Sequence, residues 1–172
     1  MKIARSVDLP CDADEAWRVL TDWERQADWM RDADAIVVTS TERTGTGVTL
    51  EVRTRLFQIP AFTETIAVTR WDPPSALTIE HGPPIRGRGE WSLTPIADGT
   101  RLTWAEDVEL EAPVLGWLLT ACYAPMLGVL LRRSMRGLRA SIIGRWPQPG
   151  YTFSSARGSV RSRRTPKRSG VT

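Results

Sequence analysis

Histidine and cysteine are scarce in this chain of 172 residues, which has one histidine, His81, and two cysteines, Cys11 and Cys122. A common zinc site needs about four such ligands together, so the sequence argues against one. There is neither a G-x-S-x-G motif nor a phosphate-binding glycine loop that leads into a helix. We therefore predict no metal and no cofactor. The two cysteines lie far apart in the sequence, and we expect them to be buried thiols rather than a disulfide.

Acidic residues are missing from the end of the chain, where residues 147–172 hold six basic residues and no Asp or Glu. Subtracting these six from the 23 basic residues leaves 17 against 20 acidic ones in 1–146, a net charge of −3. The folded part is therefore predicted to be a poor nucleic-acid surface. We expect 147–172 to be a basic disordered tail, either solvated without a partner or in weak contact with anionic membrane or nucleic acid.

The N-terminus has no apolar signal region, and this absence predicts a cytoplasmic location. Charge is also absent from residues 112–131, a stretch long enough to span a bilayer. The apolar pattern continues beyond it at helical spacing, through Met135, Leu138, Ile142 and Ile143. These features favour one long buried helix over about 113–145, with a membrane span as the alternative.

The remaining pattern predicts strands and two short helices. Asp12 and Glu15 resemble a capping box, which indicates a helix over about 13–20, and a second short helix is expected at 23–30. Alternation and turn residues predict strands at 2–9, 35–40, 48–57, 62–71, 76–81, 85–96 and 100–110. Closely spaced strands predict an antiparallel sheet, and the long helix needs its concave face as a partner. The fold class is therefore α+β, with one domain over 1–146.

This order of elements resembles the START and birch-pollen-allergen-like superfamily, also called the polyketide cyclase and lipid transport family (SRPBCC type). The resemblance rests on P-C-D-A-D-E-A-W-R-V-L-T-D at 10–22, W-x-x-Q-A-D-W-M at 23–30, W-D-P-P at 71–74, G-x-G-x-W-x-L at 87–93 and D-G-T-R-L-T-W at 98–104. It implies a helix-grip fold, a curved sheet of about seven strands around the long helix. It also implies a hydrophobic cavity for an apolar or amphipathic small molecule, such as a lipid or polyketide.

Three polar residues are candidates for chemistry in such a cavity. Strand alternation places His81, Glu64 and Glu106 on the same faces as apolar residues, so all three are predicted to face inward. The alternation also places Arg70 on the inner face of its strand. His81 is the natural acid–base group near neutral pH, and the two glutamates could form a carboxylate pair or bind a ligand hydroxyl or amine. The alternatives are a solvent-facing His81 at its strand end, and glutamates at the rim or paired with Arg70 or Arg53.

The predicted ligand-binding residues come from the apolar faces of the strands and from the long helix. They are Trp29, Leu50, Val52, Ile66, Ile79, His81, Trp91, Trp104, Glu106, Trp117 and Tyr123, with core packing as the alternative for the aromatic ones. Gly87 and Gly89 would leave room for a ligand or allow the sheet to curve. Binding of a hydrophobic small molecule, without catalysis, is the first functional hypothesis. An aromatase/cyclase-type enzyme and a toxin–antitoxin-like regulatory partner are the alternatives.

Overall fold

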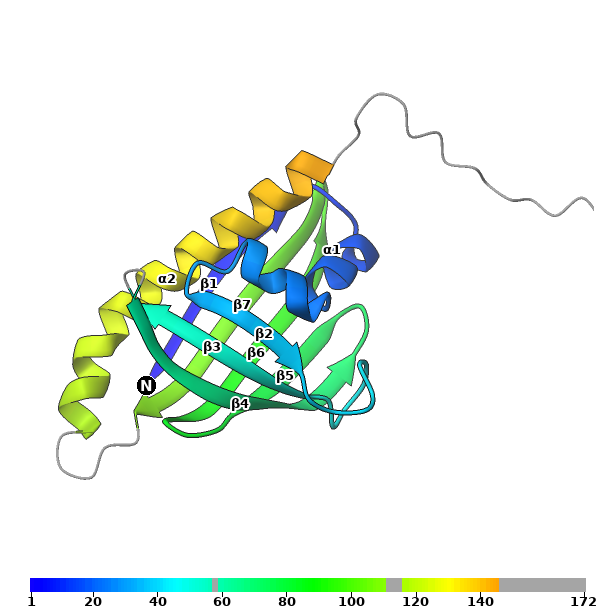
Figure 1. Ribbon diagram of the computed structural model, residues 1–172. Helices are drawn as coiled ribbons and strands as arrows, with labels where there is room; N and C mark the ends of the chain where they lie inside the picture. Colours follow the sequence, from blue (N-terminus) through cyan, green and yellow to red (C-terminus); the bar gives the residue numbers. More distant parts are fainter. Residues whose placement is uncertain (57–58, 111–115, 146–172) are drawn as a thin grey trace, which may run out of the picture.

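The chain forms a curved antiparallel sheet with a long helix along one side (Figure 1). This computed structural model describes residues 1–56, 59–110 and 116–145, with the side chains of Leu56, Leu110, 116–124 and Arg145 excepted. The elements follow the chain as β1 (Lys2–Leu9), α1 (Ala13–Leu20), the 3₁₀ helix η1 (Trp23–Asp28), β2 (Ala33–Val38), β3 (Thr49–Leu56), β4 (Ile59–Asp72), β5 (Ala76–His81), β6 (Ile85–Ile96), β7 (Gly99–Leu110) and α2 (Gly116–Arg145). The predicted α+β helix-grip fold is confirmed. The tail, 147–172, lies outside the described residues.

The sheet is one meander in which the first strand closes on the last. Its order is β1-β7-β6-β5-β4-β3-β2, and every neighbouring pair is antiparallel. Figure 1 shows α2 running past β1 and β7, while α1 and η1 lie over the concave side. The cavity-facing side chains therefore point from the sheet towards the helices.

Local sequence explains where α1 begins, whereas two later elements differ from their predicted bounds. The Asp12 carboxylate accepts a hydrogen bond from the Glu15 backbone N–H at 2.8 Å, so the predicted cap begins α1. The second short helix is a 3₁₀ helix at 23–28, shorter than the predicted 23–30. β2 also lies two residues earlier than predicted, at 33–38.

Alternation predicts the inner face correctly except where a bulge intervenes. The β4–β5 register shifts between Val68 and Arg70, and this shift turns the predicted facing of Arg70 around. Arg70 is exposed, and its Nε donates to Asp72 at 2.7 Å. Trp71 turns inward instead and contacts the rings of Trp17 and Trp23.

The core lies between the concave face of the sheet and one side of α2. Leu102 and Leu138 are fully buried there, and Met135 and Ile142 are nearly so. This burial confirms the helical spacing predicted beyond the uncharged stretch, with the exception of Ile143, whose side chain is 46% exposed on the outer side of α2. Within the described part of the chain, no helix is long and apolar enough to cross a membrane.

Candidate functional site

A cavity of about 90 Å³ lies between the sheet and α2. Its walls are mostly apolar and come from β2 to β7, the η1 region and two leucines of α2, Leu127 and Leu131. The polar or charged side chains on its described walls are Gln26, Asp32, Thr54, Glu64, His81 and Glu106. The cavity therefore combines an apolar body with a few polar groups, which is typical of a small-molecule site.

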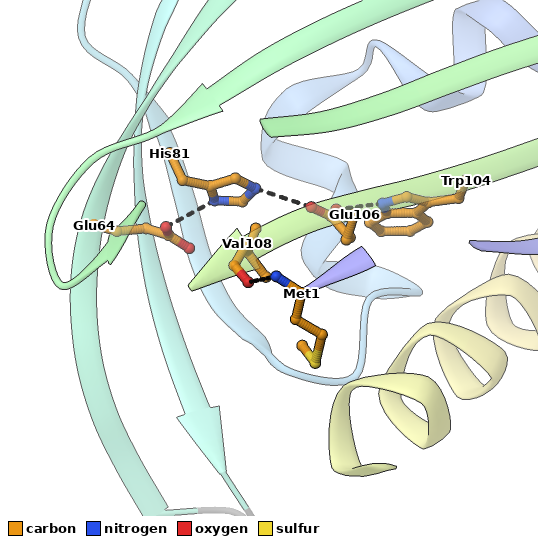
Figure 2. A network of polar contacts seen from close by, with 6 residues as sticks. All are labelled: Met1, Glu64, His81, Trp104, Glu106 and Val108. Carbon is orange, nitrogen blue, oxygen red and sulfur yellow. Dashed lines mark hydrogen bonds and ion pairs between the residues drawn. The ribbon is translucent and has the colours of Figure 1, made fainter. Parts of the chain in front are cut away.

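His81 bridges two carboxylates inside this cavity (Figure 2). Its Nδ1 lies 2.9 Å from Glu64 Oε2 and its Nε2 lies 3.2 Å from Glu106 Oε2. The His81 side chain is 10% exposed and both glutamate side chains are 6% exposed. The solvent-facing alternative for His81 is therefore wrong, as is the rim alternative for the two glutamates.

The sheet explains why residues from three strands can meet. His81 ends β5 and Glu106 lies on β7, so β6 passes between them, with Gly87 opposite His81 and Gly89 opposite Glu106. A Cβ atom at residue 89 would lie 2.9 and 3.0 Å from the two Glu106 carboxylate oxygens. The absence of a side chain at Gly89 thus leaves the space that the Glu106 side chain occupies. The sequence pattern predicted instead that this glycine leaves space for a ligand or allows the sheet to curve.

The carboxylates control the protonation of His81. Burial opposes a charged imidazole, but the hydrogen bonds and negative charges of Glu106 and Glu64 outweigh it and raise the pKa of His81 from 6.5 to about 10. At neutral pH the ring is therefore a cation whose two N–H groups donate to Glu64 and Glu106. It has no free nitrogen lone pair, so it cannot serve as a general base in this state.

Negative charge exceeds positive charge in the cavity. Two glutamates and one imidazolium leave a net charge of −1, and Asp32 adds a third carboxyl group to the walls. Burial raises the pKa of Asp32, and the charges of Glu106 and Glu64 add to this effect, whereas a hydrogen bond from Ser134 Oγ at 3.4 Å lowers it. The site therefore favours a neutral or cationic hydrogen-bond donor over an anion.

Two tryptophans complete the polar end of the cavity. Trp104 Nε1 donates to Glu106 Oε1, and the Trp104 ring meets Trp91 edge to face at 5.3 Å. The buried Trp91 indole N–H has no hydrogen-bond partner among the described residues. It is therefore a buried donor without a partner, on a residue that lines the cavity.

The structure brings most of the predicted binding residues to the cavity wall, and their role in binding stays a prediction. Those on the wall are Leu50, Val52, Ile66, Ile79, His81, Trp91, Trp104 and Glu106. Trp29 is buried but is not among the wall residues, and its ring meets Trp104 edge to face at 6.4 Å. The side chains of Trp117 and Tyr123 lie outside the described residues.

Sequence reasoning missed the wall residues outside the alternating strands. Gln26 lies in the short 3₁₀ helix η1, and Met30 and Asp32 follow it in an irregular segment, where no period predicts which side chain faces inward. Leu127 and Leu131 lie four residues apart on α2, so their helical spacing could have identified a common inner face. No pattern in the sequence indicated that Asp32 would line the cavity.

Fold and cavity together define a START-like helix-grip domain, and the comparisons with known proteins agree. The chain belongs to the polyketide cyclase/dehydrase and lipid transport family, whose sequence model matches residues 1–142. No curated protein matches the chain.

Solved structures share the fold at low sequence identity. A Thermus thermophilus protein superposes with a TM-score of 0.71 and 17% identity, covering 86% of this chain and 100% of its own. The Zhui aromatase/cyclase from a Streptomyces species superposes with a TM-score of 0.69 and 16% identity, covering 88% of this chain and 99% of its own. A START superfamily protein from Mycobacterium smegmatis superposes with a TM-score of 0.68 and 15% identity, covering 83% of this chain and 97% of its own. At such identities the likeness establishes the fold alone.

Proposed function

We propose that this protein binds an apolar or amphipathic small molecule of the lipid or polyketide kind in the cavity between the sheet and α2. The observation that supports this function is the buried Glu64–His81–Glu106 cluster within mostly apolar walls. A buried charged cluster costs folding free energy unless its groups are well paired, and function is a common reason to retain one.

The charge of the cluster narrows the class of ligand. With a net charge of −1 and Asp32 nearby, the site repels a carboxylate or phosphate and attracts a hydroxyl or amine. The Trp91 N–H can pair with a carbonyl or ether oxygen. A hydroxylated, mainly apolar molecule meets both requirements.

The cavity has to widen for a molecule of that size. Its volume of about 90 Å³ is well below the roughly 300–1,000 Å³ of typical ligand sites. We expect the ligand to bind by displacing Leu127 and Leu131, the described α2 side chains that reach the cavity. Binding should therefore move α2 relative to the sheet.

A series of three aromatic probes tests the proposed charge preference. Tryptophan fluorescence titrations with 2-naphthol, naphthalene and 2-naphthoate should rank naphthol tightest and naphthoate weakest. Loss of a charged hydrogen bond is worth about tenfold or more in affinity, so naphthol should exceed naphthalene by at least about that factor. Glu64→Gln with Glu106→Gln should remove the discrimination against naphthoate. Glu90→Gln is the matched control, because Glu90 is exposed and pairs with Arg88 outside the cavity.

Native mass spectrometry of protein purified from its host supplies an independent measurement. A bound lipid or aromatic molecule that is lost on cavity substitution supports the proposal. Equal affinities for naphthol and naphthoate, together with a chain that takes up nothing from host extract, contradict it.

A second candidate function is an aromatase/cyclase-type enzyme, and the same cluster supports it. The His81 imidazolium could donate a proton and a glutamate could accept one, which are the two transfers that cyclisation followed by dehydration needs. The shared fold with the Streptomyces aromatase/cyclase is consistent with this. Replacing His81, Glu64 and Glu106 together by Gln should then abolish turnover of a polyketide-like substrate. Unchanged product formation would refute this catalytic role of the cluster.

A further inference from the structure

An open groove of about 740 Å³ lies outside the cavity, beside the middle of α2. Its described walls carry four arginines, Arg31, Arg55, Arg133 and Arg136, and no acidic residue. The groove and the cavity lie back to back, because Met30 and Asp32 line the cavity while Arg31 between them lines the groove. The groove is lined by arginines and the cavity by carboxylates, so the two sites have opposite charge.

Backbone contacts hold the arginines together. Arg133 and Arg136 lie three residues apart on α2, so they share a face of the helix. Arg31 joins them because its backbone N–H donates to Ser134 Oγ at 3.3 Å. Gly137 allows this close approach, since a Cβ atom there would lie 2.4 Å from the Trp29 carbonyl oxygen.

Most of this positive charge is uncompensated. Arg55 pairs with Asp34 at 3.3 Å, whereas Arg31, Arg133 and Arg136 form no ion pair with a carboxylate of the described chain. Like charges held in one groove repel each other, and an anion between them would relieve that repulsion. Guanidinium groups suit phosphate and carboxylate oxygens because their planar N–H groups can bind two oxygens at once.

The groove also has an apolar side. Met126, Val129 and Leu130 line it, and the Val129 side chain is 47% exposed. We propose that this groove is a second binding site, for a single-chain anionic amphiphile with a phosphate or carboxylate head. The arginines bind the head, and the alkyl chain lies along Met126, Val129 and Leu130. The inference does not depend on the proposed function, because the carboxylates of the cavity repel such a head.

Titration calorimetry with dodecyl phosphate, kept below its critical micelle concentration, tests this site. Arg133→Gln with Arg136→Gln should weaken binding at least about tenfold, the effect of losing charged hydrogen bonds. Arg53→Gln with Arg132→Gln is the matched control, because it removes the same charge from exposed residues that do not line the groove. The control should bind as the wild type does. Affinity should fall as salt is raised.

Further probes distinguish this groove from a general charge effect and from a membrane-binding surface. Inorganic phosphate should bind much more weakly than dodecyl phosphate, and equal affinities would overturn the apolar part of the inference. If both double variants bind dodecyl phosphate equally weakly, the loss of affinity comes from net charge alone, and the proposed site is overturned.

Vesicles of phosphatidylglycerol test whether the groove is a membrane-binding surface. Tight binding to these vesicles without binding of monomeric dodecyl phosphate would overturn the amphiphile site and indicate a membrane-binding surface. Unchanged affinity in Glu64→Gln would support a site separate from the cavity. Thermal unfolding of each variant verifies that it is folded, and Arg133→Lys with Arg136→Lys should retain part of the affinity.

Discussion

His81 should keep its proton in the folded protein until about pH 10, and this retention should make stability depend on pH. The folded-state pKa of about 10 exceeds the ordinary value of 6.5. Protonation therefore stabilises the folded state fully below about pH 6.5, and the contribution is lost as the pH rises through 10. One unit of pKa corresponds to about 1.4 kcal/mol, so about 3 kcal/mol should be lost between pH 7 and pH 10.

Two measurements check this expectation. His81 is the single histidine of the chain, so its ring resonances in an NMR titration need no assignment. Its midpoint should lie near pH 10 in the wild type and fall by more than one unit in Glu106→Gln, because one of the two carboxylate charges is removed. Glu90→Gln should leave it unchanged.

Urea unfolding measures how the free energy of unfolding depends on pH. The free energy of unfolding of the wild type should fall between pH 7 and pH 10 by about 3 kcal/mol more than that of His81→Gln. Burial raises the pKa of the Cys11 thiol, which also affects stability at high pH, but this effect is common to both proteins and cancels. A histidine that titrates below about pH 7.5, or parallel stability curves, would refute the reasoning.

Packing predictions can be tested with matched pairs. Gly89→Ala should cost about 1–3 kcal/mol, because its new Cβ meets the Glu106 carboxylate, and it should also lower the pKa of His81 by displacing that group. Gly144→Ala is the control, because Gly144 has open space around it on α2 and the substitution should be neutral or stabilising. Equal unfolding midpoints for the two glycine variants would contradict the predicted clash. In the second pair, Leu138→Ala should cost about 2–5 kcal/mol, since this side chain is fully buried. Val129→Ala on the exposed side should cost little, and a similar loss from both would contradict the assigned face of α2.

The two oppositely charged sites suggest how one ligand class could be told from another. The cavity disfavours anions because Asp32, Glu64 and Glu106 all line it, whereas the groove gathers arginines without acidic neighbours on its described walls. An anionic head and a hydroxylated apolar body should therefore bind in different places. Competition between dodecyl phosphate and 2-naphthol would measure whether the sites influence each other.

Sequence alone determined the order of the elements and most of the inner face of the sheet. Alternation is a local property, since successive side chains of a strand point to opposite faces. It therefore placed Glu64, His81 and Glu106 correctly, and it failed at Arg70, where one extra residue in β4 reverses the facing. The helical period of α2 likewise predicted the buried Leu138 but gave the wrong side for Ile143.

Only the tertiary structure decided which of these groups meet. His81 reaches Glu106 across an intervening strand, and that contact exists because Gly89 has no side chain there. Asp32 and Arg31 come from an irregular segment, and both are placed by hydrogen bonds with Ser134, which lies about a hundred residues later on α2. Gly137 lets the same segment come close to the helix at Trp29. Neither contact has a period or a motif in the sequence, because both depend on how distant elements approach one another.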